Sequence, residues 1–318
     1  MKRILIVTLA VLFSSFAAHA AVVNVTSYAT GGTGTAANPW TSIDGTAGIQ
    51  AALTALEATP PYDGVLYAPA GYYKITTRID FTAKSTNQVG QFAGDQALTL
   101  RGDGPLETIL IGSTGGMVLD TTGRDFLNLE DFGIVQANSE QNPQSTIGIF
   151  QARGQKTVGG SGYMNFPQHQ TIRRVYIDFA SQPTANGNHG SLGIYNRGAE
   201  SGVYDNLQIN ADIPLTLTAD NIYSISTTVS GLTHPSIAEC TNNHIRGGNY
   251  TTMATNANSG WANIIYATSI ALQGSTDNTT IDGAILRKAG SGEESVAPLY
   301  SMQVYPDFVA NSDRTLGL

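Results

Sequence analysis

The 318-residue sequence predicts an all-β fold in which short strands stack as the coils of a solenoid. Three observations favour this class. Glycine is abundant, with 35 residues, and only 13% of the chain is charged, which favours turns and sheet over helix. Only one segment has convincing helical periodicity. The rest is a series of short strand-like runs separated by Gly, Asn, Asp and Pro, along which a weak repeat recurs.

Charge and cysteine content narrow the classes of function. The formal net charge is -8 and the sequence pI is near 5.0, so we do not expect nucleic acid as a partner. The single cysteine, Cys240, can form neither an intrachain disulfide nor a cysteine-based zinc site, and we expect it to be a buried small hydrophobe. A hydrophobic content of 41% with a mean hydropathy of -0.07 is typical of a globular chain.

The first twenty residues have the pattern of a secretory signal peptide. Lys2 and Arg3 precede an apolar run over residues 4–13 that is too short to span a bilayer, and Ala18-His19-Ala20 is a small-x-small cleavage site. We therefore expect cleavage after Ala20 and a secreted or periplasmic protein that does not associate with a membrane. The alternative is an N-terminal membrane anchor.

One helix is expected near the start of the mature chain. Residues 21–43 form a lead-in whose glycine cluster is expected to be flexible. Ile49, Ala52, Leu53 and Leu56 then fall at helical spacing, which predicts a helix over 46–57, with Ser42 or Asp44 as its cap. The solenoid domain is expected over 44–305, followed by a tail, 306–318, with no recognisable cap.

Strands are expected from Gly64 onward. The strand-like runs are 65–67, 72–75, 98–101, 108–111, 117–119, 126–129, 132–135, 147–151, 171–179, 193–195, 203–209, 214–218, 222–228, 264–272 and 279–286.

The repeat has an apolar residue, two polar residues, an apolar residue, any residue and another apolar one. Its five copies start at residues 129, 172, 204, 241 and 281. Stacked coils bring equivalent residues to about 4.8 Å from one another. The polar pairs then form two columns, in which opposite charges pair and Asn tolerates left-handed backbone. One column is Glu130, Arg173, Asp205, Asn242 and Asp282, and the other is Asp131, Arg174, Asn206, Asn243 and Gly283.

Three stretches carry a family resemblance: Asp44-Gly-Thr-Ala-Gly-Ile-Gln-Ala-Ala-Leu, Gly64-Val-Leu-Tyr-Ala-Pro-Ala-Gly-Tyr-Tyr-Lys-Ile, and Leu98-Thr-Leu-Arg-Gly-Asp-Gly-Pro with Thr108-Ile-Leu-Ile. Here the sequence resembles the pectate-lyase-like right-handed parallel β-helix proteins, nearest to their rhamnogalacturonase, epimerase and tailspike branch. The resemblance implies a right-handed parallel β-helix whose N-terminal end is capped by the helix. It is specific over 44–113 and diffuse over 114–290.

The chain departs from the family pattern in two places. Asn38-Pro-Trp-Thr-Ser-Ile replaces the acidic lead usual before the helix, and the Asn-Thr-Asp, Asp-Asp and Arg-Ile-Lys signatures of the polygalacturonase branch are missing from the sequence. The resemblance therefore supports the fold more than any mechanism.

The resemblance implies a polysaccharide ligand, bound in a groove between long loops at 136–146, 154–170, 180–190 and 252–263. Aromatic rings can stack on sugars, although packing within the loops is the simpler interpretation of each. The aromatic candidates are Tyr163, Phe166, Tyr195, Tyr250 and Trp261.

Two chemistries are compatible with the ionisable residues. Hydrolysis requires two carboxyl groups across the glycosidic bond, and Asp178, Glu200 and Asp205 are the candidates. A lyase requires a base beside a neutralised uronate carboxylate. The candidates for that role are Arg173, Arg174, Arg197, His169 and His189. For Arg173 and Asp205 the alternative is the structural charge column, and for His189 it is a surface loop.

The leading hypothesis is an exported glycoside hydrolase acting on a pectin-like or other complex glycan. The alternatives are a polysaccharide lyase and a non-catalytic glycan-binding or adhesin-type β-helix. No cofactor is required by any motif, and Ca²⁺ is a candidate without an EF-hand-type signature. Homotrimers are common among the tailspike relatives, so a homo-oligomer is a further candidate.

Overall fold

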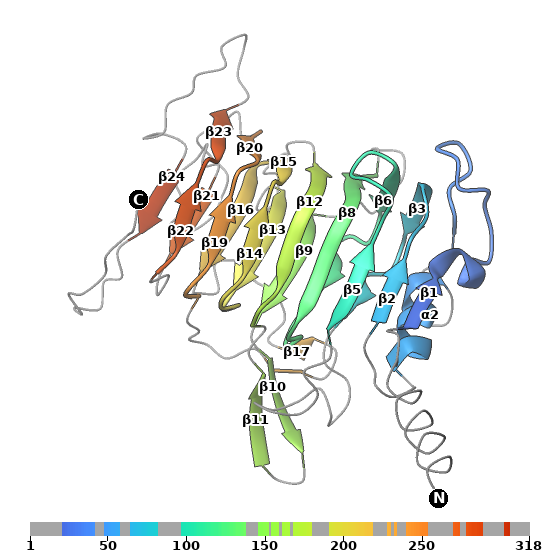
Figure 1. The fold of residues 1–318 in the computed structure, drawn as a ribbon, viewed down its shortest axis with the longest axis horizontal. Helices are drawn as coiled ribbons and strands as arrows, with labels where there is room; N and C mark the ends of the chain where they lie inside the picture. Colours follow the sequence, from blue (N-terminus) through green and yellow to red (C-terminus); the bar gives the residue numbers. More distant parts are fainter. Residues whose placement is uncertain are drawn as a thin grey trace, which may run out of the picture.

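The computed structural model describes residues 21–41, 48–57, 64–81, 97–137, 146–152, 154–158, 161–165, 168–179, 191–218, 228–229, 232–233, 240–253, 270–273, 278–288 and 302–305. Over these residues the chain is a stack of β-coils with one α-helix at the N-terminal end (Figure 1). Every described strand pair in the two large sheets is parallel, so the expected all-β parallel β-helix is confirmed. No described helix is long and apolar enough to cross a membrane.

A 13-stranded sheet forms two sides of the stack among the described residues. Its main path is β1 (Ala21–Asn24), β2 (Gly64–Tyr67), β5 (Leu98–Arg101), β8 (Leu127–Gln136), β12 (Thr171–Asp178), β14 (Val203–Asp205), β19 (His244–Arg246) and β22 (Thr280–Asp282). The other side-by-side strands of this sheet are β3 (Gly71–Ile75), β6 (Thr108–Gly112), β15 (Gln208–Ala211), β20 (Asn249–Thr252) and β23 (Ile285–Lys288).

A 7-stranded sheet closes the remaining side in the described part of the chain. Its order is β4 (Ile79–Asp80), β7 (Met117–Asp120), β9 (Ile147–Ala152), β13 (Leu192–Arg197), β16 (Ile213–Thr218), β21 (Ile270–Gln273) and β24 (Met302–Tyr305). The chain visits the two sheets alternately, so residues one coil apart in sequence become neighbours in space.

Left-handed backbone turns each coil at the same two places. One column contains Asp131, Arg174, Asn206, Gly247 and Gly283, all with φ between 48° and 67°. A second column, one or two residues before the paired strands, contains Phe126, His169, Ser201, Asn242 and Asn278, with φ between 48° and 57°. Because L-residues rarely adopt this conformation, its recurrence marks the corners of the coil.

The core lies between the sheets and is built from stacked apolar residues. Leu100, Leu129, Ile172, Tyr204 and Ile245 are in register on successive strands, and all are fully buried. Each coil therefore buries its apolar residues against the same positions of the next coil, as expected for a solenoid.

The capping helix is confirmed as α2 (Gly48–Glu57), within the expected range of 46–57. It buries Ile49, Ala52, Leu53 and Leu56 in the core, while its two candidate caps lie outside the described residues. Residues 21–24 of the lead-in are part of the β-helix, because they form β1, which pairs with β2 as the first strand of the 13-stranded sheet.

The predicted start of the fourth repeat copy, Thr241, is wrong. The structure stacks Ile245, not Thr241, on Tyr204, and it places Arg246 beside Asp205. Asn242 and Asn243 belong instead to the preceding corner, where Asn278 Nδ2 donates to Asn242 Oδ1 at 3.2 Å. Inward packing of Ile245 and the left-handed Gly247 determine this register, which a loose apolar pattern cannot distinguish.

A hairpin occupies part of the expected loop 154–170. Strands β10 (Gly154–Val158) and β11 (Ser161–Asn165) pair antiparallel, with Val158 opposite Ser161, and project below the stack in Figure 1. The Gly159-Gly160 dipeptide between them is a typical hairpin signal in the sequence. Two short strands, β17 (Thr228–Val229) and β18 (Leu232–Thr233), complete this small sheet.

Candidate active site

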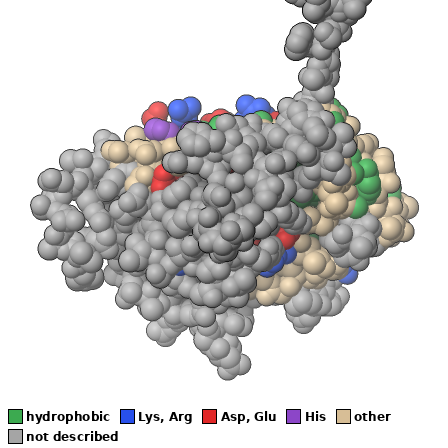
Figure 2. Space-filling view, turned by 90° about the horizontal axis from the view of Figure 1, so that it is seen from below, with side chains coloured by type: hydrophobic (Ala, Val, Ile, Leu, Met, Phe, Trp, Pro, Cys, Tyr) green, Lys and Arg blue, Asp and Glu red, His purple; other side chains and the backbone are tan. Residues whose placement is uncertain are grey.

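The charged column of the repeat is a ladder of alternating sign on the outside of the 13-stranded sheet. Arg173 Nε donates to Glu130 Oε2 at 2.7 Å, and Arg174 binds both carboxylate oxygens of Asp131 at 2.6 and 2.7 Å. Figure 2 shows charged side chains of both signs along one edge of the stack. The strand register gives the ladder Arg101, Glu130, Arg173, Asp205, Arg246 and Asp282.

The charges of the ladder are paired within the fold. Each internal member lies between two residues of opposite charge, and the hydrogen bond from Arg174 lowers the pKa of Asp131. Arg173, Arg174 and Asp205 are thereby accounted for by their neighbours in adjacent coils.

The three carboxylates expected to drive hydrolysis do not converge. Asp205 belongs to the ladder, whereas Asp178 lies beyond the left-handed bend and pairs in register with Asn210. Glu200 lies at the preceding corner, where its Oε2 accepts from Gln168 Nε2 at 3.1 Å. The register positions of Asp178 and Asp205 are five residues apart along β12, up to roughly 16 Å of strand, and the corner at Ser201 lies between Asp205 and Glu200.

The aromatic and histidine candidates are also dispersed. Tyr195 and Tyr250 are fully buried, so the expectation that they stack on sugar is wrong. His169 stacks on Phe126, with ring centroids 4.8 Å apart, and its Nδ1 lies 3.6 Å from Asp125. Tyr163 lies in β11, and His189, Phe166 and Trp261 lie outside the described residues.

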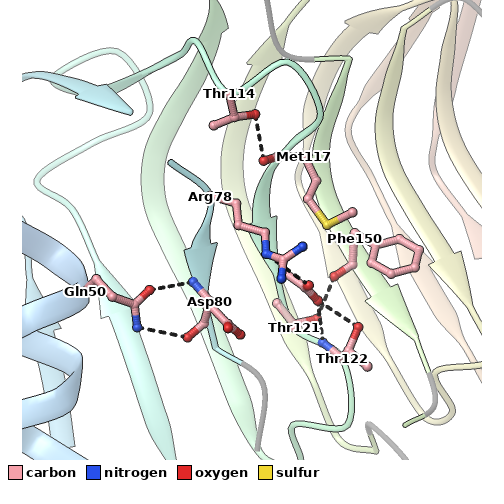
Figure 3. A network of polar contacts seen from close by, with 9 residues as sticks. Gln50, Arg78, Asp80, Thr114, Met117, Thr121, Thr122 and Phe150 are labelled. Carbon is pink, nitrogen blue, oxygen red and sulfur yellow. Dashed lines mark hydrogen bonds and ion pairs between the residues drawn. The ribbon is translucent and has the colours of Figure 1, made fainter. Parts of the chain in front are cut away.

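A different pair of carboxyl groups comes together on the outer side of the 7-stranded sheet. Asp80 ends β4 and Asp120 ends β7, and the two residues are partners in the parallel register. Neighbouring strands lie about 4.8 Å apart, which places the two side chains next to each other. In Figure 3, Asp80 lies beside Gln50, and Arg78 lies between Asp80 and the side chains of Thr121 and Thr122.

Asp120 is a buried carboxyl group with an incomplete set of partners. Its Oδ1 accepts hydrogen bonds from Thr122 N at 3.0 Å and Thr122 Oγ1 at 2.7 Å. Its Oδ2 accepts no hydrogen bond from the described residues, and Arg78 Nε lies 3.7 Å from it. Burial raises the pKa of Asp120 to about 6, since the Thr122 hydrogen bonds and Arg78 only partly offset it, and the negative charge of Asp80 adds to the increase.

The capping helix holds Asp80 in place. Gln50 Nε2 donates to the Asp80 carbonyl oxygen at 3.2 Å, and the Asp80 amide donates to Gln50 Oε1 at 2.7 Å. The carboxamide thus supplies the donor and acceptor that a neighbouring strand would supply at the edge of a sheet (Figure 3). Because β4 is the first strand of its sheet, this clamp fixes the position of Asp80 relative to Asp120.

Aromatic and basic groups continue along the same face. Phe150 pairs in register with Asp120 on one side and with Tyr195 on the other, and the two rings are 5.4 Å apart. Arg197 ends β13 and is buried, on a different sheet from Arg174. Of the basic candidates that the structure describes, only Arg197 therefore belongs to the sheet that carries Asp80 and Asp120.

The sequence contained little signal for this pair. Asp80 and Asp120 are isolated acidic residues that belong to no recognisable motif and lie 40 positions apart. Only the strand register brings them together. Among the described residues, no group of three or more His, Cys, Asp or Glu side chains is placed to hold a metal ion.

Comparisons with known proteins found similarity to solved structures alone. No family model and no curated protein sequence matches the chain. Among solved structures, the mannuronan C-5 epimerase AlgE4 A-module of Azotobacter vinelandii is 16% identical with a TM-score of 0.40, covering 90% of this chain and 74% of that one. An alginate lyase from a Paenibacillus species is 15% identical, with a TM-score of 0.45 and coverage of 77% and 64%. A GH87 α-1,3-glucanase catalytic unit from Streptomyces thermodiastaticus is 16% identical, with a TM-score of 0.45 and coverage of 84% and 41%.

Proposed function

We propose that this protein is an exported polysaccharide-active enzyme, and specifically a glycoside hydrolase in which Asp120 is the proton donor and Asp80 the second carboxylate. The observation that carries the proposal is the pairing of Asp80 with Asp120 across β4 and β7, with one carboxyl group buried and the other partly exposed. Hydrolysis of a glycosidic bond requires such a pair of carboxyl groups in different environments.

The roles follow from the environments of the two groups. The raised pKa of Asp120 keeps it protonated at mildly acidic pH, so it can give its proton to the leaving oxygen of the glycosidic bond. Asp80 is the partly exposed member, suited to attack the sugar or to activate water. Asp120 itself is fully buried, so the substrate must displace the atoms that cover it before the proton can move.

Arg78 distinguishes this site from the charge ladder. Its guanidinium is one-third exposed and lies beside the buried carboxylate, where it can contact substrate and limit the increase in the pKa of Asp120. An arginine here is also compatible with neutralising a uronate carboxylate, which a lyase requires. The proposed assay therefore reads both reactions.

The test is an assay of the mature chain on pectin, alginate and α-1,3-glucan, with calcium or with EDTA, for reducing ends and for unsaturated-uronate absorbance. We expect reducing ends without absorbance, and a loss of about 100-fold or more in Asp120→Asn and Asp80→Asn. The control Asp282→Asn, at the exposed end of the ladder, should stay within about twofold of the unmodified protein.

Two results would overturn the assignment. Unsaturated-uronate absorbance would identify a lyase, and retention on a polysaccharide without cleavage would identify a binding protein. The pH dependence of activity gives an independent check. Activity should fall above about pH 6, and this limb of the pH profile should move to lower pH in Asp80→Asn, because the negative charge beside Asp120 is lost. A limb that does not move would contradict the role of Asp80.

A further inference from the structure

The outer face of the 13-stranded sheet changes character beyond the left-handed bend. On β12, β15 and β20, which lie side by side along the upper part of Figure 1, the charged ladder is replaced by an aromatic ring and side-chain amides. Tyr176 pairs in register with Gln208 and then Asn249, and Asp178 pairs with Asn210. We call these five residues the Tyr176 shelf. Gln208 is exposed and the other four are partly exposed.

The Tyr176 ring is held at both of its ends. Its register partner on β8 is Gly133, and a Cβ at that position would lie 3.5 Å from Tyr176 Cδ1, so the ring passes close over this glycine. At the other end, the ring is flanked by Asp178 and by Asn210 on the next strand, and Asn210 Nδ2 donates to Asp178 Oδ1 at 3.3 Å. Burial and Asp178 together raise the pKa of Tyr176 to about 12. A ring fixed in this way loses little conformational entropy when a ligand stacks on it.

Gly133 is required for this arrangement. A Cβ there would lie 2.5 Å from the carbonyl oxygen of Pro105, so no other residue fits between the strand and the chain at Pro105. Gly133 therefore lies between the chain at Pro105 and the Tyr176 ring.

The amides beside the ring supply hydrogen-bonding groups. Gln208 is exposed on the next strand, and Asn249 is partly exposed on the strand after it. An aromatic ring with adjacent planar amides matches the alternating apolar faces and hydroxyl groups of a sugar.

The charge of the surroundings selects against acidic ligands. Asp178 is the one ionisable acid of the shelf, and the whole chain carries a net charge of -8. A polyuronate would be repelled by both, whereas a neutral chain would not. We propose that the Tyr176 shelf binds a neutral polysaccharide, with Tyr176 stacking on a sugar ring and Gln208 and Asn249 hydrogen bonding to hydroxyls. The shelf lies on a different sheet from Asp80 and Asp120, so this binding does not depend on the proposed hydrolysis.

The test is affinity gel electrophoresis of the mature protein in dextran, laminarin, soluble xylan and, as the anionic comparison, alginate. We expect retardation by at least one neutral polysaccharide and a loss of affinity of about 10-fold in Tyr176→Ala. Tyr176→Phe keeps the ring and should stay within about threefold. Tyr72→Ala removes another partly exposed tyrosine of the same sheet and should bind as the unmodified protein does.

Thermal unfolding of each variant checks that it is folded, and Asn249→Ala provides a second probe if Tyr176→Ala is not. The proposal is overturned if no neutral polysaccharide retards the protein, if alginate alone does, or if Tyr176→Ala and Asn249→Ala bind normally. Asp120→Asn should retain full binding, so the loss of catalysis and the loss of the shelf remain separate results.

Discussion

The two sheets of the β-helix carry charge in different ways. On the 13-stranded sheet, Glu130 and Asp131 each receive an arginine from the next coil at hydrogen-bonding distance. On the 7-stranded sheet, Asp120 is more deeply buried than either, yet its arginine lies 3.7 Å away and the nearest strand partner is another carboxylate. The carboxylates of Glu130 and Asp131 are thus each neutralised by an arginine, whereas the carboxylate of Asp120 is only partly compensated.

This difference separates structural carboxylates from candidate catalytic ones. Hydrogen bonds from Arg174 lower the pKa of Asp131, and burial raises that of Asp120 to about 6. A buried carboxyl group with a raised pKa destabilises the fold when it is ionised. Such a group is a candidate functional residue, because a structural role would favour a complete set of partners.

The largest expected effect on stability is at Asp120. Between about pH 4 and pH 6 the folded protein keeps a proton on Asp120 that the unfolded chain has lost, so the free energy of unfolding falls as pH rises through this window. The full loss is about 3 kcal/mol. Asp120→Asn should not show this pH-dependent loss. Its stability relative to the unmodified protein should therefore increase from pH 4 to pH 7, and urea denaturation measures the difference. A difference that is constant with pH would contradict this expectation, and Asp282→Asn serves as the control.

The next effect is at the clamp between the capping helix and β4. Gln50→Ala removes both hydrogen bonds to Asp80, so we expect kcat/KM to fall about 10-fold and the pKa of Asp120 to decrease as Asp80 moves away. Carboxyl ¹³C NMR titration reads that pKa without requiring activity. Thr54→Ala alters the same helix, where Thr54 Oγ1 donates to the Gln50 carbonyl oxygen, and should leave the titration unchanged. Equal titrations in both variants would refute a positioning role for Gln50.

The smallest effects are expected at Arg173 and Arg174, which bind neighbouring carboxylates of the preceding coil and should differ. Arg173→Gln removes the guanidinium that hydrogen bonds to the buried Glu130, which keeps only its register neighbour Arg101, and should cost about 1 to 2 kcal/mol of unfolding free energy. Arg174→Gln exposes a more accessible Asp131 and should cost about 0.5 kcal/mol. Denaturation at low and high salt measures both. A larger cost for Arg174→Gln would show that the burial of the carboxylate does not determine the cost of losing its arginine.

The sequence predicted the repeating parts of the fold well and the site poorly. Glu130 with Arg173 and Asp131 with Arg174 were recognisable because the apolar positions around them repeat closely enough to set the register. The fourth copy failed because Thr241 and Ile245 both satisfy a loose pattern, and only inward packing selects Ile245. Tyr195 and Tyr250 were candidates for stacking on sugar, but their places within strands bury them.

The sequence by itself determined the parallel β-helix, its capping helix and most of its charge ladder. These features depend on short apolar runs, glycines and one amphipathic segment, a local periodicity that is repeated coil after coil. Tertiary structure decided which residues face each other across the coils. Asp80 meets Asp120, and Tyr176 lies over Gly133, only through strand register. Register depends on how every coil packs on its neighbour, and loops of unequal length hide it from sequence spacing.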